Sequence, residues 1–95
     1  IKRIEPITYN NRGEAKAALG DHLGAIDDYT IAIRYFSDFY DANHNRGISK
    51  YNLNDYEGAI ADYSKVIEIY PDYVEALFNV IDWSVVSGKY DAALS

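Results

Sequence analysis

The sequence predicts an all-α protein: a short solenoid of about two and a half antiparallel helical hairpins. Two observations carry this prediction. The chain repeats itself at an interval of 34 residues, which is typical of arrays whose units cannot bury their apolar faces alone. Within each unit the apolar residues recur with the 3.6-residue period of an amphipathic helix, whereas the period of 2 that is expected of strands is found nowhere in the sequence.

Three units make up one predicted domain, residues 1–95. Residues 6–39 align with 40–73 without a gap and share 13 identical residues in 34 positions. The third unit, 74–95, is degenerate and incomplete, and residues 1–5 are expected to be the tail of a preceding element. The identical pairs are Asn11/Asn45, Arg12/Arg46, Gly13/Gly47, Lys16/Lys50, Leu19/Leu53, Asp21/Asp55, Gly24/Gly58, Ala25/Ala59, Ile26/Ile60, Asp28/Asp62, Tyr29/Tyr63, Ile33/Ile67 and Asp38/Asp72.

Each unit is predicted to form a first helix, a tight turn and a second helix. The second helices carry apolar residues at i, i+1, i+4, i+7 and i+8, and turn residues such as Gly20-Asp21 and Asn54-Asp55 precede them. Pro71 closes the second unit. We expect first helices at about 7–19, 41–53 and 74–86, and second helices at about 23–36, 57–70 and from 91 onward.

Glycine lies inside two of the predicted first helices, as Gly13 and Gly47. A glycine there costs about 1 kcal/mol relative to alanine. Helices whose axes lie about 8–10 Å apart need Gly or Ala where their backbones come closest. We therefore expect a contact at each glycine that tolerates no methyl group.

Each first helix also carries a basic pair at i, i+4, and each second helix carries an aspartate that recurs with the same period. We expect ion pairs between the packed helices, which fix register more reliably than they add stability. A phosphate site is the alternative. The residues are Arg12, Lys16 and Asp28 in the first unit and Arg46, Lys50 and Asp62 in the second.

At these positions the chain resembles the tetratricopeptide repeat family, whose unit is a 34-residue helical hairpin. The matching residues are Gly13/Gly47, Gly20/Asn54/Gly88, Ala25-Ile26/Ala59-Ile60/Ala93-Leu94, Tyr29/Tyr63 and Pro71. The departures are Ser37 in place of Pro, Arg12 and Arg46 in place of Leu, and Ile81 in place of Gly. The resemblance implies a right-handed α-solenoid with a concave face lined by the first helices, and a non-enzymatic interaction module that binds a peptide or protein segment there.

Composition excludes several other classes of function. The net charge of −6 makes the chain a poor nucleic-acid binder, and no apolar run approaches the roughly 18 residues of a membrane span. There is no cysteine, and no metal-binding spacing joins His22 to His44, so we expect no metal, no cofactor and no enzymatic activity. The N-terminus lacks the apolar centre of a signal peptide. A soluble chain is expected, with the cytoplasm favoured.

The ligand-binding residues follow from the resemblance, which assigns one stripe of each first helix to the concave face. Asn11, Asn45 and Asn79 would form a ladder of amides toward a peptide backbone, or would bond only within the array. Tyr51 and Phe78 would anchor an apolar or cationic side chain, or would only pack between units. The predicted site residues are Asn10, Asn11, Glu14, Asp41, His44, Asn45, Tyr51, Asn52, Phe78, Asn79 and Asp82.

The charge of this stripe predicts the kind of ligand. It contains acids but no Lys or Arg, which favours a neutral or basic peptide. Members of the family that grip the acidic C-terminal tails of heat-shock chaperones use a clamp of Lys, Arg and two Asn. The corresponding places hold Asn10, Glu14, Asn45, Glu75 and Asn79, of which only Asn45 matches, so we expect no binding to such tails. His44 would make binding mildly pH-sensitive or would be a solvated surface residue, like His22 in the turn.

A second function is compatible with the same repeats. The last helix begins only at Asp91, so the array lacks a polar terminal helix, and apolar residues around Trp83 would be left open. Trp83 stands where Ala15 and Ser49 stand in the other units, and would either form part of a terminal core with no further role or contact further repeats or a second copy of the chain. The alternative is therefore a structural, scaffolding segment that stacks on further repeats, or forms a homo-oligomer, through this C-terminal end.

Overall fold

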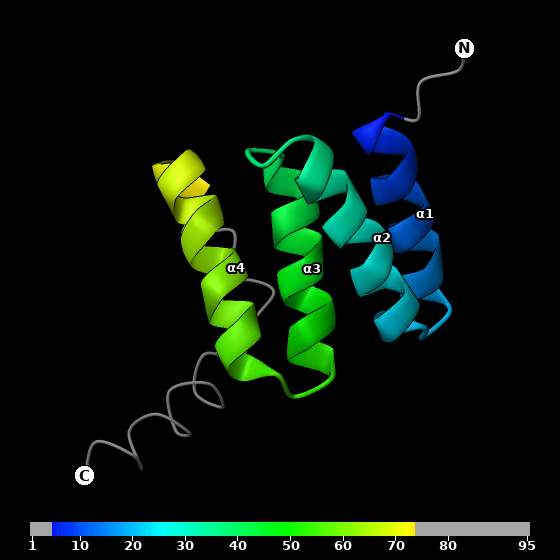
Figure 1. Ribbon diagram of the computed structural model, residues 1–95. Helices are drawn as coiled ribbons and strands as arrows, with labels where there is room; N and C mark the ends of the chain where they lie inside the picture. Colours follow the sequence, from blue (N-terminus) through cyan, green and yellow to red (C-terminus); the bar gives the residue numbers. More distant parts are fainter. Residues whose placement is uncertain (1–4, 74–95) are drawn as a thin grey trace, which may run out of the picture.

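The computed structural model describes residues 5–73, which form two helical hairpins side by side (Figure 1). Residues 5–73 contain no strand, and the predicted all-α fold is confirmed. The predicted helices 74–86 and from 91 onward lie outside the described residues, as do Glu75, Phe78, Asn79, Asp82 and Trp83. The elements are α1 (Pro6–Ala18), α2 (His22–Tyr35), α3 (Tyr40–Asn52), α4 (Tyr56–Ile69) and a short 3-10 turn, η1 (Pro71–Tyr73).

The two hairpins turn in the same way because they use the same residue types. Gly20 and Asn54 adopt left-handed backbone conformations, with φ of 86° and 66°, which end α1 and α3. Asp21 and Asp55 then cap the following helices, accepting hydrogen bonds from the N–H groups of Gly24 and Gly58 at 2.9 and 3.0 Å. Compared with the predicted bounds, each described helix begins and ends one residue earlier.

The predicted close contact at the glycine of each first helix is present, but its partner is a tyrosine ring and not the opposing backbone. A Cβ added to Gly13 would lie 2.6 Å from Cε1 of Tyr29, and one added to Gly47 would lie 2.5 Å from Cε1 of Tyr63. Both tyrosines are buried in the hairpin cores. Glycine thus makes room for a large apolar ring between the two helices of each unit.

The predicted ion pairs are also present in both hairpins. Nε and Nη2 of Arg12 donate to the carboxylate of Asp28 at 2.9 and 2.7 Å, and Nζ of Lys16 lies 3.1 Å from the same carboxylate. Arg46 and Lys50 hold Asp62 in the same way, at 2.9, 2.7 and 3.2 Å. Both aspartates are buried, so these pairs satisfy carboxylates that the packed helices remove from water.

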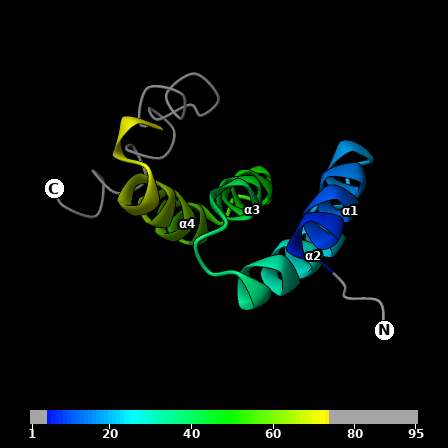
Figure 2. The ribbon, with the colours of Figure 1, turned by 90° about the horizontal axis from the view of Figure 1, so that it is seen from above.

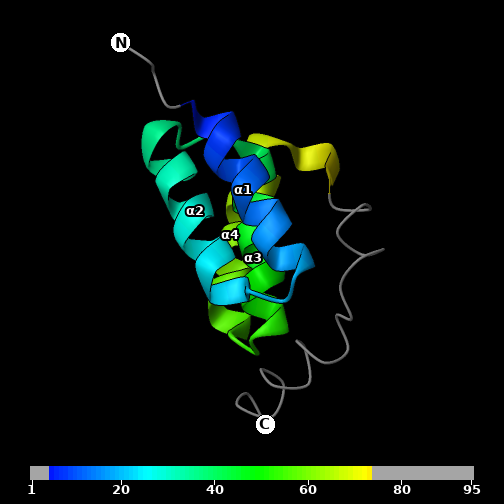
Figure 3. The same ribbon diagram turned by 90° about the vertical axis from the view of Figure 1, so that its right-hand side faces the viewer.

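The hairpins stack through α2, which packs against both α1 and α3. Seen from above, α1 and α3 lie on the same side of α2 (Figure 2), and the side view places α1 in front of α3 (Figure 3). Nη1 of Arg46 donates to the hydroxyl of Thr30 at 3.2 Å, and the His22 ring lies 3.2 Å from the hydroxyl of Ser49. The first helices of the two units are thereby held next to each other.

Candidate functional site

A polar cluster joins α1 to α3 on the predicted binding face. Nδ2 of Asn45 donates to Oδ1 of Asn10 at 3.1 Å and to Oε1 of Glu14 at 3.0 Å. Both N–H groups of the Asn45 amide therefore donate within the array. Only the amide oxygen, Oδ1, remains to accept a hydrogen bond from a ligand. Asn10 is only 5% exposed, whereas Glu14 is exposed.

The amide ladder predicted from Asn11, Asn45 and Asn79 is thus not made of equivalent members. Asn11 is exposed, and its side-chain amide forms no hydrogen bond within the described chain, so the amide is accessible from solvent. Asn45 bonds within the array, which is the alternative that its recurrence left open. Asn79 lies outside the described residues.

The remaining residues of the predicted stripe on α3 differ in how far they reach solvent. Asp41 and Asn52 are exposed, and the Asn52 side chain donates to the carbonyl of Ile48 at 2.9 Å. Tyr51 is half-buried, with its ring edge-on to Tyr56 at 5.5 Å between centroids. Tyr51 therefore takes part in packing within the second hairpin and presents only part of its surface.

Both histidines are less exposed than a solvated surface residue. The ring of His44 lies 6.2 Å from that of Tyr63, and burial lowers the pKa of His44, an effect that the nearby carboxylate of Asp41 opposes. His22 begins α2 and is half-buried against Ser49 of the next hairpin. Burial therefore disfavours the charged form of the His44 ring, and the carboxylates of Glu14 and Asp41 give this face its charge.

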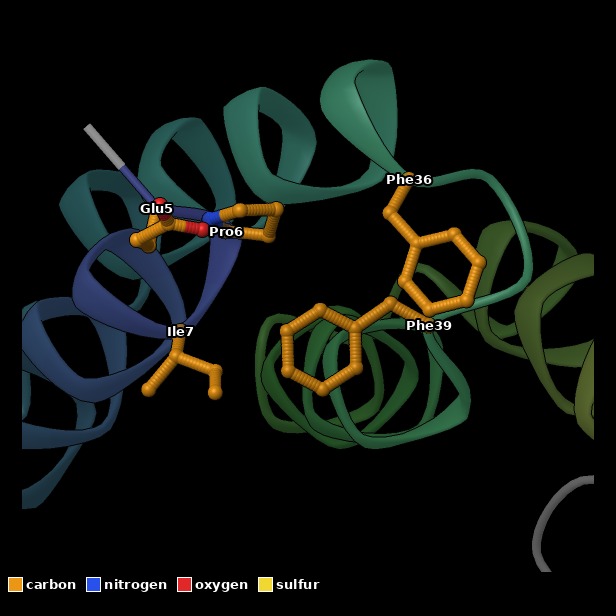
Figure 4. Close-up of a pocket in the computed structure, with 5 residues that line it drawn as sticks. All are labelled: Glu5, Pro6, Ile7, Phe36 and Phe39. Atoms are coloured by element: carbon orange, nitrogen blue, oxygen red, sulfur yellow. The ribbon is translucent and has the colours of Figure 1, made fainter. Parts of the chain in front are cut away.

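An apolar hollow of about 320 Å³ lies at the end of the same face, where α1 begins and α2 runs into α3. In Figure 4, Ile7 and Phe39 lie on opposite sides of this space, and Phe36 and Pro6 lie above it. The rings of Phe36 and Phe39 are 6.0 Å apart. Glu5 is the one charged residue among the five that line the hollow.

Ile7 lies one turn before Asn10 and Asn11 on the same stripe of α1, but sequence reasoning missed the hollow. Phe36 caps the end of α2 and Phe39 caps the start of α3, so neither belongs to the stripe of a first helix. The sequence did contain a signal for it. The linker reads Phe36-Ser37-Asp38-Phe39, and two large apolar residues are unusual in a turn segment, where polar residues are expected. Phe36 remains about half exposed in the structure.

In residues 5–73, no group of three or more His, Asp or Glu side chains is arranged to hold a metal ion. None of the four helices has both the length and the apolar character needed to cross a membrane.

Comparisons with known proteins agree with this fold. The family model of the tetratricopeptide repeat matches residues 40–73. A search of curated proteins found no match. Among solved structures, the chain is similar to the first TPR of Spaghetti (RPAP3) bound to the HSP90 peptide SRMEEVD, with a TM-score of 0.80 and 25% sequence identity over 92% of this chain and 67% of that one.

Proposed function

From its similarity to tetratricopeptide repeat proteins, we propose that this chain is a non-enzymatic module that binds a peptide or protein segment on the face formed by α1 and α3. The observation that carries the proposal is the similarity, over 92% of the chain, to a repeat domain that holds a peptide. The same face has the components that peptide sites use. Exposed amide and carboxylate groups of Asn11, Glu14 and Asp41 accompany an apolar hollow.

The proposed ligand is neutral or basic. Glu14 and Asp41 are exposed on this face, and the whole chain has a net charge of −6. The basic residues of α1 and α3 are already engaged by Asp28 and Asp62, so they are poorly placed to receive a carboxylate. The N–H groups of Asn45, the one residue that matches the carboxylate clamp, are also engaged. Acidic peptides should therefore be repelled.

The test is selection from a displayed random-peptide library on the purified chain, followed by affinity measurements on the selected peptides. Asn11→Ala with Asp41→Ala should abolish binding, because both side chains are exposed on the face and neither hydrogen-bonds within the described chain. The matched control, Asp27→Ala with Glu68→Ala, removes exposed acids from the second helices and should leave binding unchanged. Equal losses in the two double variants would contradict the proposed face.

The peptide SRMEEVD serves as the test of charge, because the similar structure contains it. We expect no binding of SRMEEVD, and selected sequences that are neutral or basic. Micromolar affinity for SRMEEVD would overturn the charge part of the proposal and leave the peptide-binding face intact.

A second candidate function, a segment that stacks on further repeats, is favoured by one specific observation. The guanidinium side chain of Arg46 is 18% exposed because α2 covers it, whereas that of Arg12, at the same place in the first unit, is 58% exposed. Ser49 is buried and its counterpart Ala15 is exposed. On α3 this surface is covered by the second helix of the preceding unit, α2. The equivalent surface of α1, its outer face, is exposed in the structure, so the second helix of another unit could cover it.

Stacking through this surface would be measured by sedimentation velocity over a range of concentrations. Ala15→Arg should abolish any association that uses the outer face of α1, because a long charged side chain would occupy the contact. Trp83→Ala should abolish association through the C-terminal end. A chain that stays monomeric at every concentration would speak against self-association.

A further inference from the structure

The residues that line the apolar hollow differ from their counterparts in the second hairpin. At the offset of 34 residues, Pro6 corresponds to Tyr40 and Phe36 corresponds to Tyr70. In the second hairpin the rings of Tyr40 and Tyr70 pack at 5.6 Å with an interplanar angle of 35°. In the first hairpin the small ring of Pro6 stands where the second hairpin has a tyrosine, and the space of about 320 Å³ beside Phe36 stays open.

We propose that this hollow binds an aromatic side chain of the peptide, which lies against Phe36 as Tyr40 lies against Tyr70. The proposal rests on the proposed function, since the peptide on the α1 and α3 face supplies the side chain. Ile7 belongs both to that face and to the hollow, so the two surfaces are continuous (Figure 4).

The lining fits a ring in shape and in chemistry. Pro6, Ile7, Phe36 and Phe39 surround the space with apolar groups, and an offset or tilted ring pair is the arrangement that aromatic side chains prefer. Ile7 is 61% exposed and Phe36 is 52% exposed, so their surfaces are available without any rearrangement of the chain. An occupant that removes this surface from water is favoured by the hydrophobic effect.

Charge decides which aromatic peptides fit best. Glu5 places a carboxylate on the lining, and none of the five lining residues is Lys or Arg. A phenol can donate a hydrogen bond to a carboxylate, and a cationic residue next to the ring would be attracted to it. The hollow therefore favours tyrosine or phenylalanine in a neutral or basic peptide over the same residue in an acidic one.

The probe for the test is acetyl-Lys-Tyr-Lys-amide, compared with acetyl-Lys-Leu-Lys-amide of equal charge. Binding is followed by NMR of the chain with ¹³C-labelled isoleucine methyl groups, with the Ile7 signal assigned by Ile7→Val. The tyrosine peptide should shift the Ile7 methyl and bind about threefold or more tightly than the leucine peptide, the preference expected of a ring pair. Equal affinities would show that the hollow does not select a ring and would overturn the proposal.

Three variants locate the bound ring. Phe36→Ala removes the surface on which the ring packs, and Pro6→Tyr fills the space with the side chain that the second hairpin has there, so both should abolish the Ile7 shift. Tyr70→Ala is the matched control, because Tyr70 is exposed to the same extent as Phe36, 53% against 52%, but its partner Tyr40 already occupies the equivalent place. Circular dichroism checks that all three variants fold. A shift retained in both Phe36→Ala and Pro6→Tyr would overturn the proposal.

The longer peptides from library selection separate this inference from the proposed function. If their binding requires Asn11 and Asp41 but shows no aromatic preference and no response to Phe36→Ala, the face binds peptides and the hollow inference is wrong. If the tyrosine tripeptide binds at the hollow but no longer peptide depends on Asn11 and Asp41, the hollow stands and the proposed face is wrong. If Phe36→Ala weakens the selected peptides tenfold or more and they carry an aromatic residue, both are supported.

Discussion

The glycine of the second hairpin gives the sharpest test of the packing. A Cβ on Gly47 would lie 2.5 Å from Cε1 of Tyr63, and that ring is 1% exposed, so it has no open space into which to move. One added methyl group in a packed core costs about 1–3 kcal/mol. Alanine regains about 1 kcal/mol of helix propensity over glycine. We therefore expect Gly47→Ala to destabilise the chain by about 1 kcal/mol, and Gly47→Leu to prevent folding.

The assay is a double-mutant cycle by thermal and urea unfolding. In a Tyr63→Leu background the ring is gone, so Gly47→Ala should become stabilising by about 1 kcal/mol, which gives a coupling of about 2 kcal/mol between the two sites. A change of 1 kcal/mol corresponds to a shift of about 4–8 °C in the Tm of a domain this small. An increase in Tm when Gly47→Ala is made in the unaltered chain would refute the steric argument.

Three further predictions concern charge. Asp62→Asn should cost about 3 kcal/mol in urea unfolding because it leaves the covered Arg46 without its carboxylate, and Asp28→Asn should cost less because Arg12 is more exposed. The hydrogen bond from Arg12 lowers the pKa of Asp28, so its stabilising effect is present above its unfolded pKa of about 4 and is lost as pH falls through the folded pKa; Asp28→Asn should flatten the acid unfolding curve. Burial lowers the pKa of His44 in the folded chain, so below about pH 6.5 the unfolded chain takes up a proton at this residue more readily than the folded chain. The Tm should therefore fall between about pH 7.5 and pH 5.5, and it should fall less in His44→Gln.

The residues that sequence reasoning located correctly are those whose position depends on one hairpin alone. The close contact at Gly47, the turn at Asn54-Asp55 and the ion pair of Asp62 all follow from the helical period and the turn between two consecutive helices. That the partner of Gly47 is the ring of Tyr63, and that Asp55 caps α4, came from the structure. The exposure of Arg12 could not be foreseen from its own hairpin, because it depends on whether another helix covers α1. The two phenylalanines of the linker signalled an apolar surface, but the hollow itself did not follow from them, because it depends on the space that Pro6 leaves open beside Phe36.

Comparison of the two hairpins also shows which recurring residues hold the fold and which are free to meet a ligand. Identical residues of the two units mostly form caps, ion pairs and the glycine–tyrosine contacts, whereas the stripes on α1 and α3 differ at nearly every place. Asn11 and Asn45 are the exception, since they are identical and lie on the stripe. Identity at this place has a structural cause in the second unit, where Asn45 joins Asn10 and Glu14.

This difference between two identical residues can be measured. Asn45→Ala removes two hydrogen bonds between α1 and α3 and leaves the buried Asn10 oxygen unsatisfied, so it should lower the free energy of unfolding by about 1–2 kcal/mol. Asn11→Ala removes an exposed amide and should change stability by less than about 0.5 kcal/mol. If the two substitutions cost the same, Asn45 does not couple the hairpins, and both asparagines would then be equally available to a peptide. If only Asn45→Ala lowers the free energy of unfolding, then a loss of peptide binding in Asn11→Ala cannot come from lost stability. It then reports a lost contact with the peptide.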